Sequence, residues 1–304
     1  MTVENDGTLT TDYNWSQGRP DVAGGIICQN GSYVFDQYQP LYIEDIKSLL
    51  EAPTSIKRLE FCIGGWGNGS YGNIVKLIRQ EGCDSNSILY KNFKALKEVL
   101  PEVVAINNDQ EQDYELKEVI AFHKMLYEIG YKTTIAPYTM KSYWQSLVAN
   151  LNNDHEICDR VYLQTYGGGA YNDPNDWKVF GDIPMYVGFD NESNSSVKKM
   201  FERFINWRNT ADVQGGFVWN FNNDKYDLKE WASAVNSVFP DSEDNGSVGV
   251  NVADLDEKAV IYDINGKRIM EAGSMEEGIE SILKSSLAKG IYIVKGREVR
   301  KVIK

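Results

Sequence analysis

The sequence predicts an α/β fold, a (β/α)8 TIM barrel followed by a small C-terminal all-β domain. Short apolar runs alternate with longer helical patterns as far as residue 240, which is the pattern of parallel strands joined by helices. An acidic segment rich in turn residues follows, and the remaining chain shows only short β-type runs. These two observations predict a barrel at 1–240, a linker at 241–248 and a small domain at 249–304.

Seven apolar runs have the length and composition of strands. They are Val22–Gln29, Ile56–Ile63, Val103–Asn107, Lys132–Pro137, Arg160–Tyr166, Ile183–Gly188 and Gly215–Trp219. An eighth strand is expected near Tyr33–Tyr38. Almost no connection precedes it, so we expect the barrel to be irregular or incomplete near its second strand.

Helices are expected between these strands, at Ile43–Glu51, Leu89–Leu100, Glu115–Ile129, Lys141–Leu151, Val197–Asn209 and Leu228–Val238. The third has the clearest pattern, because apolar residues recur there at steps of three and four, the period of one helix face. In the small domain, Ala259–Asp263 and Lys267–Met270 flank Asn265-Gly266, a strong signal for a two-residue hairpin. Gly290–Lys295 and Val299–Ile303 flank a second turn at Gly296.

Composition excludes several classes of function. The chain carries 31 Lys and Arg against 44 Asp and Glu, a net charge of −13, which disfavours binding to nucleic acid or to an anionic membrane. No apolar stretch is long enough for a membrane span, and no signal peptide is visible. With two histidines and no C-x-x-C pair, zinc fingers and related metal sites are excluded, so we expect no metal. We also expect no cofactor, and a monomeric protein.

One predicted strand ends in an unusual run of polar residues. Side chains alternate along a strand, so Asn107, Asp109 and Glu111 should share one face. In a barrel, residues at the C-terminal ends of strands form the active site. The alternative interpretation is a strand that simply runs into a solvated loop before the next helix.

Other predicted strands end in residues suited to sugars. Gly65 and Trp66 follow one strand, Tyr138 follows another, and Gln164, Tyr166 and Trp219 close two more. Each has a plain structural explanation as a turn glycine or a core aromatic. Together they would place aromatic faces and carboxyl groups at one rim, where sugar rings stack and their hydroxyl groups find hydrogen bonds.

These landmarks resemble glycoside hydrolase family 18, the chitinases and endo-β-N-acetylglucosaminidases. The family's D-G-x-D-x-D-x-E motif on strand four corresponds to Val104–Glu111, and its S-x-G-G motif on strand three corresponds to Cys62–Gly65. The family's strand-six tyrosine, in a Q-x-Y variant, corresponds to Gln164 and Tyr166, and its last-strand tryptophan to Trp219. The likeness covers about residues 20–235 in the right order.

The resemblance implies cleavage of a β-1,4 linkage after N-acetylglucosamine, by a retaining mechanism in which the substrate's own N-acetyl oxygen is the nucleophile. Glu111 would be the acid/base and Asp109 would orient the acetamido group. Tyr166 would donate a hydrogen bond to the acetamido oxygen, and Trp219 would lie beneath the sugar. Chitin oligomers, N-glycan cores and peptidoglycan all remain possible substrates.

One departure leaves an alternative open. The family's middle aspartate is Asn107 here, which can hydrogen-bond Asp109 but cannot accept its proton. A catalytically weak or inactive barrel that binds N-acetylglucosamine-containing glycans as a lectin is therefore the main rival. A surface or structural protein without a glycan site is a third interpretation.

Two further patterns bear on location and cofactor. Ile261–Arg268 and Lys289–Arg297 resemble the Y-D-x-x-G-R and G-x-Y-x-V-K patterns of type IX secretion sorting domains of Bacteroidetes, which implies export to the cell surface or beyond. Gly67–Gly72 fits G-x-G-x-x-G, but no acidic residue follows convincingly at the end of a second strand. A dinucleotide-binding enzyme is thus a weak alternative.

Overall fold

The computed structural model describes residues 1–11, 25–191, 196–220, 228–240, 259–263, 268–272, 275–284, 291–295 and 299–303. The chain divides into two compact units, Met1–Asn223 and Asp224–Lys304. The predicted linker at 241–248 lies outside the described residues, and the predicted domain limits remain predictions.

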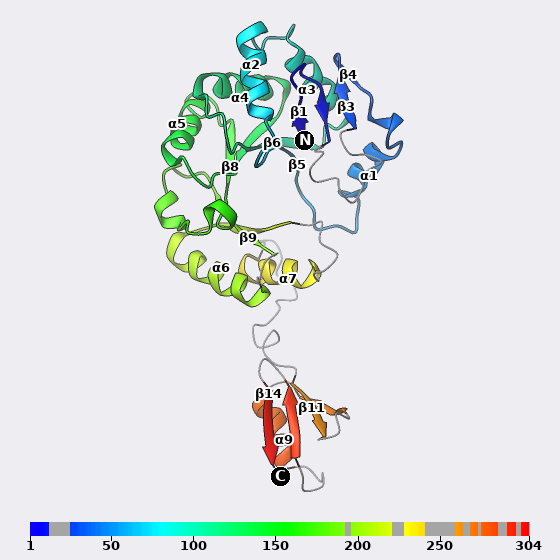
Figure 1. The fold of residues 1–304 in the computed structure, drawn as a ribbon, viewed down its shortest axis with the longest axis vertical. Helices are drawn as coiled ribbons and strands as arrows, with labels where there is room; N and C mark the ends of the chain where they lie inside the picture. The colour runs from blue at the N-terminus through cyan, green and yellow to red at the C-terminus, as the bar shows by residue number, and fades with distance from the viewer. Residues whose placement is uncertain are drawn as a thin grey trace. The chain divides into compact units, whose positions relative to one another are not determined.

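A parallel sheet of six strands forms the centre of the first unit and curls into half a barrel (Figure 1). Its strands follow one another in chain order, so each neighbour in the sheet is the next strand in the sequence. They are β5 (Leu59–Gly64), β6 (Val103–Asp109), β7 (Lys132–Ile135), β8 (Cys158–Leu163), β9 (Met185–Asp190) and β10 (Gly215–Trp219). Six of the predicted strands are thereby confirmed.

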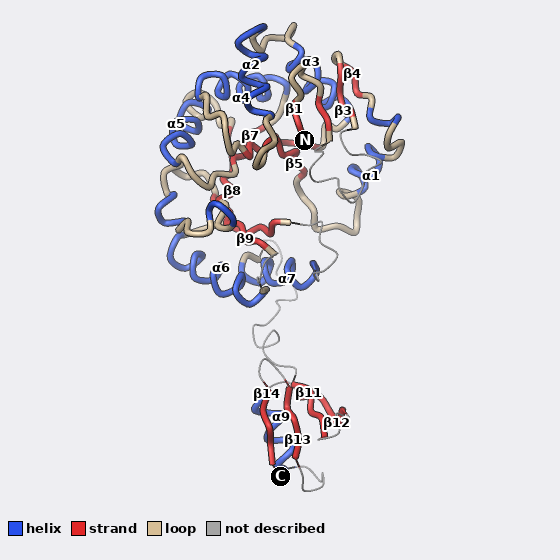
Figure 2. The backbone as a smooth tube through the Cα atoms, in the orientation of Figure 1, coloured by secondary structure: helices blue, strands red, loops and turns tan. Residues whose placement is uncertain are grey.

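Helices cover the convex side of this sheet, and the strands line the inside of the curl (Figure 2). The arrangement follows from the chemistry of parallel pairing, since each strand must be joined to the next by a crossover that returns to the same edge. The helices of this unit are α1 (Tyr42–Ser48), α2 (Ser70–Glu81), α3 (Ile88–Val99), α4 (Leu116–Ile129), α5 (Lys141–Leu151) and α6 (Val197–Ala211). Among the described residues, no helix is both long and apolar enough to cross a membrane.

Local sequence explains where these helices begin and which face they bury. The Ser87 side chain accepts a hydrogen bond from the backbone N–H of Tyr90 at the start of α3, and Ser196 caps α6 in the same way. In α4 the expected apolar stripe is buried, including Val119, Phe122 and Leu126. Helix α2 was not among the expected helices.

The first two predicted barrel strands are placed differently from the expectation. Ile26–Gln29 (β3) and Ser32–Tyr33 (β4) form an antiparallel hairpin in a separate sheet with β1 (Thr2–Val3) and β2 (Leu9–Thr10). Asn30 and Gly31 join them, both with positive φ, and a two-residue connection cannot link parallel strands. The closed eight-stranded barrel is therefore not confirmed, since the described residues contribute six strands to the parallel sheet.

The second unit contains α7 (Leu228–Val238), a four-stranded sheet and a further helix. Its sheet has the order β12-β11-β13-β14, all antiparallel, and matches the four predicted strands closely. The bounds are β11 (Ala259–Asp263), β12 (Arg268–Ala272), β13 (Ile291–Lys295) and β14 (Val299–Ile303). Helix α9 (Met275–Lys284) lies between β12 and β13 in the sequence, and its Ile282 shares the core of the sheet with Ile261 and Tyr292. The expectation of an all-β domain was therefore wrong.

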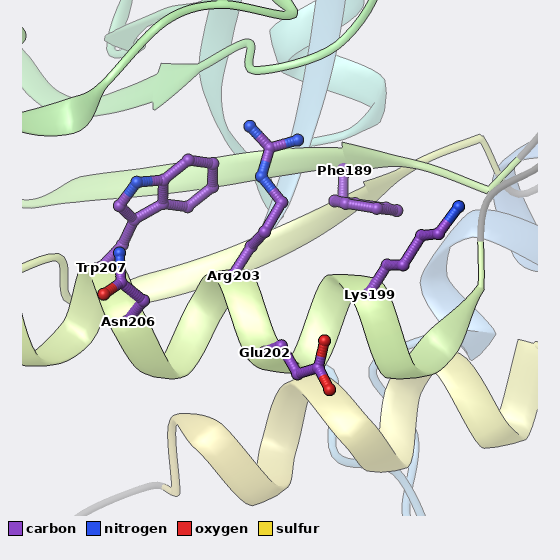
Figure 3. A pocket seen from close by; sticks show the side chains of 6 residues that line it. All are labelled: Phe189, Lys199, Glu202, Arg203, Asn206 and Trp207. Atoms are coloured by element: carbon purple, nitrogen blue, oxygen red, sulfur yellow. The ribbon is translucent and has the colours of Figure 1, made fainter.

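An arginine on α6 is held between aromatic rings beside a pocket of about 440 Å³ (Figure 3). The Arg203 guanidinium lies 4.5 Å from the centre of the Trp207 ring and 5.7 Å from that of Phe189. Burial lowers the pKa of Arg203 from its ordinary value. The rings therefore act as the main partners of a cation that is partly removed from water.

Replacing Arg203 by alanine is expected to lower the free energy of unfolding by about 1 kcal/mol, because the cation–π contacts and the packing of the side-chain stem are both lost. Urea unfolding of the purified protein measures this effect. Lys198→Ala is the matched control on the same helix, because its exposed pair with Glu202 is expected to contribute less than about 0.5 kcal/mol. Equal effects of the two substitutions would contradict the stabilising role of the rings.

Candidate functional site

A cavity of about 420 Å³ lies within the curl of the sheet. Side chains from four strands line it at alternate positions, as the pleat of a strand requires. Arg58 and Glu60 form a polar end towards the N-terminal ends of the strands, and Asp109 lies with Tyr166 and Trp219 at their C-terminal ends. The lining residues are Arg58, Glu60, Cys62, Asn107, Asp109, Ala136, Arg160, Tyr162, Gln164, Tyr166, Phe217 and Trp219.

Asp109 is the last residue of β6 and projects into this cavity. Its carboxylate accepts a hydrogen bond of 2.8 Å from Nε2 of Gln164, and the same amide group donates to the carbonyl oxygen of Ala136 at 2.9 Å. Burial raises the pKa of Asp109 to about 7, and the nearby charge of Glu111 adds to this rise. Asp109 can therefore exchange a proton near neutral pH.

Glu111 lies two residues beyond the strand and is half-buried. Burial raises the pKa of Glu111 above its ordinary value, and a hydrogen bond with Gln164 opposes this rise. Gln164 thus contacts both carboxyl groups. The arrangement is a coupled pair of acids that share one amide and have raised pKa values, the property that a general acid requires.

Two aromatic rings form a wall of the same cavity. The rings of Tyr166 and Trp219 are nearly parallel, with centres 5.6 Å apart and planes at 15°. The pKa of the Tyr166 hydroxyl is raised by burial and then by the charge of Asp109, which places this hydroxyl close to the carboxyl groups. A flat apolar surface therefore lies next to the acids.

Asn191, which is fully buried, holds the chain beyond Trp219. Its Oδ1 accepts a hydrogen bond of 2.9 Å from the backbone N–H of Asn220, and its Nδ2 donates to the Asn220 carbonyl oxygen at 2.7 Å. Its own backbone N–H donates to the carbonyl oxygen of Trp219 at 2.9 Å. The peptide bond between Trp219 and Asn220 is cis.

The glycines after β5 allow the backbone to approach Asp109. The backbone N–H of Gly65 donates to the carbonyl oxygen of Asp109 at 2.6 Å. Gly64 has a φ of +109°, and a Cβ atom there would lie 2.2 Å from the same oxygen. The glycines thus let this turn lie directly against the backbone at the end of β6.

Gly64→Ala is expected to lower the free energy of unfolding by about 3 kcal/mol, because it adds both backbone strain and a collision with the Asp109 carbonyl group. Gly67→Ala is the matched control, since φ is also positive there but nothing lies within 4 Å of an added Cβ atom. We expect about 1 kcal/mol for the control. Chemical unfolding of both variants gives the comparison, and equal losses would show that strain alone acts at Gly64.

The remaining predicted binding residues lie in different environments. Asn107 lines the cavity below Asp109, and its Nδ2 donates to Oγ1 of Thr134 at 2.9 Å. Tyr138 lies close to the acids, since its pKa is raised by burial and then by the charges of Glu111 and Asp109. Trp66 is 88% exposed and does not line the cavity. Of the predicted residues, five line the cavity and three lie near Asp109 without lining it. The five are Asn107, Asp109, Gln164, Tyr166 and Trp219, and the three are Gly65, Glu111 and Tyr138.

Sequence reasoning missed the polar end of the cavity. Glu60 accepts hydrogen bonds from Arg58, from Thr134 and from the hydroxyl of Tyr162. Arg58 also makes a two-pronged ion pair with Asp159, at 2.9 and 3.0 Å. Alternating Arg58, Glu60 and Cys62 on one predicted strand was a usable signal, because charges inside an otherwise apolar strand require partners.

No model of a protein family matches the sequence, and no curated protein matches it either. In the part of the chain that the structure describes, no three His, Cys, Asp or Glu residues lie close enough together to hold a metal ion.

Proposed function

We propose that the protein is a glycoside hydrolase that cleaves a β-1,4 linkage after an N-acetylglucosamine residue. The observation that carries this proposal is the pair of coupled acids, Asp109 and Glu111, beside the parallel rings of Tyr166 and Trp219. Acids with raised pKa values suit glycosidic bond cleavage, and aromatic faces bind the C–H faces of sugar rings. The resemblance to family 18 supports the same assignment.

The proposed mechanism uses the substrate's acetamido group as the nucleophile. The sugar lies against Trp219, and neutral Glu111 at the mouth of the cavity donates its proton to the departing glycosidic oxygen. The acetamido oxygen attacks the anomeric carbon, forming a bicyclic oxazolinium ion. Asp109, held by Gln164, accepts a hydrogen bond from the acetamido nitrogen and stabilises the positive charge.

The second half-reaction restores the enzyme. Glu111, now a carboxylate, removes a proton from a water molecule that attacks the anomeric carbon on the face left by the leaving group. The oxazolinium ring opens, the acetamido group is regenerated and the β configuration is retained. Tyr166 donates a hydrogen bond to the acetamido oxygen during the attack. Its hydroxyl is near Asp109, because the charge of Asp109 raises the pKa of Tyr166.

Comparison of two substrates tests this proposal. Chitotetraose carries the N-acetyl group and cellotetraose carries a hydroxyl group in its place, with the same β-1,4 linkage. We expect hydrolysis of chitotetraose and none of cellotetraose, as followed by chromatography of the products. Cleavage of both at similar rates would contradict a substrate-assisted mechanism.

A second candidate function is glycan binding without cleavage. Asn107 favours it, because its amide lies where family 18 has an aspartate that shares a proton with the next one. A lectin would bind chitotetraose without producing shorter sugars, and substitution of Glu111 would change its affinity little. Calorimetric binding together with product analysis separates the two functions.

We also propose that the C-terminal unit directs export of the protein. Strands β11 and β13 of its antiparallel sheet overlap the two segments that resemble type IX sorting domains. A reporter protein joined to residues 224–304 should appear outside the cells of a bacterium with that secretion system. Retention of the reporter inside cells that export a known substrate would contradict this role.

A further inference from the structure

A chain of hydrogen bonds runs from the polar end of the cavity to Asn107, two residues before Asp109. The hydroxyl of Thr134 donates to Oε2 of Glu60 at 2.6 Å. The same hydroxyl oxygen, Oγ1, accepts a hydrogen bond from Nδ2 of Asn107 at 2.9 Å. Asn107 precedes Asp109 by two residues on β6, so both side chains face the same cavity. Thr134 is fully buried and Asn107 is 8% exposed.

The direction of this chain follows from the donors and acceptors available. A threonine hydroxyl has one proton, and an ionised carboxylate can only accept hydrogen bonds. Glu60 is surrounded by donors, because Arg58 and the hydroxyl of Tyr162, at 3.0 Å, both donate to its Oε1. The proton of Thr134 therefore points to Glu60, and Asn107 must present its N–H group to Thr134.

This direction decides which atom Asn107 offers to a ligand. One of the two N–H groups of its Nδ2 is engaged by Thr134, and in the described residues no hydrogen bond is made to its Oδ1. The Oδ1 of Asn107 is therefore left as the hydrogen-bond acceptor that this residue offers in the cavity beside Asp109. An amide of unfixed direction would offer an acceptor in some molecules and a donor in others.

We infer that Glu60, acting through Thr134, is a positioning residue that fixes the amide of Asn107 so that the cavity selects a ligand with a hydroxyl or N–H donor beside Asp109. Neither Glu60 nor Thr134 needs to touch the reacting atoms for this role. The inference rests on the proposed function for its kinetic consequence, whereas the direction of the amide is a property of the protein itself.

Thr134→Val and Thr134→Ser form a matched pair for the kinetic test. Valine has the shape of threonine without the hydroxyl, while serine keeps the hydroxyl. We expect Thr134→Val to lower kcat/KM for chitotetraose by about fivefold to tenfold, the effect of one hydrogen bond, and Thr134→Ser to stay within about twofold of the wild type. Equal activity of the valine and serine variants would overturn the inference.

Glu60→Gln provides a test that does not need activity. Its amide can donate to Thr134, which frees the threonine proton to point to Asn107 and reverses the asparagine. NMR spectra of the ¹⁵N-labelled protein follow the side-chain NH₂ group of Asn107, identified by its loss in Asn107→Asp. In the wild type we expect slow exchange of one of its protons with water, and in Glu60→Gln an altered chemical shift with faster exchange.

The two proposals fail in different ways. If the wild type does not cleave chitotetraose, the proposed function is wrong, and the NMR comparison still decides the role of Glu60. If the wild type is active but the Asn107 resonances are the same in Glu60→Gln and in the wild type, the positioning role is wrong. Thermal unfolding of each variant confirms that the comparison is made between folded proteins.

Discussion

Glu111→Gln is expected to lower kcat for chitooligosaccharides by a factor of ~10² to 10⁴, the usual contribution of general acid–base catalysis. Glutamine has nearly the shape of glutamate and can still hydrogen-bond with Gln164, but it has no proton to give to the leaving oxygen. Binding should change little, because the cavity walls and the Tyr166–Trp219 pair remain in place. Initial rates and calorimetric affinities of the purified variant measure the two effects separately.

Glu115→Gln is the matched control for this experiment. Glu115 lies four residues further on, exposed on the surface and paired with Arg79 at 2.9 Å. We expect wild-type kcat for the control. Hydrolysis by Glu111→Gln at the wild-type rate would contradict the role of Glu111 and exclude it as the acid.

Asp109→Asn is expected to stabilise the protein while it reduces activity. Because the pKa of Asp109 is raised from 3.8 to about 7, the folded state holds this proton more tightly than the unfolded state. Below about pH 4 Asp109 is protonated in both states and does not change the free energy of unfolding. As the pH rises towards 7, the group ionises more readily in the unfolded state, and the free energy of unfolding falls. Asparagine removes that cost and still offers Gln164 an acceptor oxygen.

The expected gain at pH 8 is on the order of 1–3 kcal/mol in the free energy of unfolding, and it should disappear below about pH 4. Urea unfolding of wild type and variant at several pH values measures it. Asp154→Asn, in an exposed loop, is the control and should have little effect at any pH. A loss of stability in Asp109→Asn at pH 8 would show that the charge of Asp109 is compensated in the folded protein.

These two expectations describe one feature of the site. Burial makes the ionisation of Asp109 unfavourable, and in the same surroundings its charge, once formed, attracts a positively charged intermediate more strongly than it would in water. The same burial that prepares Asp109 for this role reduces the stability of the folded chain. Such an exchange of stability for function is common at active sites.

The sequence predicted the parallel strands well because their signals are local. Gly215–Trp219 and α5 have the expected bounds, and in α4 the apolar stripe is buried as its spacing predicted. The hairpin at Asn30-Gly31 was missed, although it carries the same dipeptide that predicted the later turn at Asn265-Gly266. The apolar residues before it have the pattern of a barrel strand, but a two-residue turn after them predicts an antiparallel hairpin.

Helix α9 and the polar end of the cavity show a different limit. Helix α9 was not among the expected helices, and the surface it packs on is built by strands on both sides of it in the sequence. Arg58 is two residues from Glu60 on the same predicted strand, but the other two partners, Thr134 and Tyr162, come from β7 and β8, and no spacing along the chain indicates those. Asp109, Glu111, Tyr166 and Trp219 were easier to predict, because strand ends meet at one edge of a parallel sheet.

The most direct test of the central claim is the configuration of the first product. Proton NMR of chitotetraose during hydrolysis distinguishes the two anomers of the newly formed reducing end before they interconvert. Attack by the acetamido group followed by water predicts that the β anomer appears first and then equilibrates. Initial release of the α anomer would show single displacement by water and would contradict the roles assigned to Asp109 and Glu111.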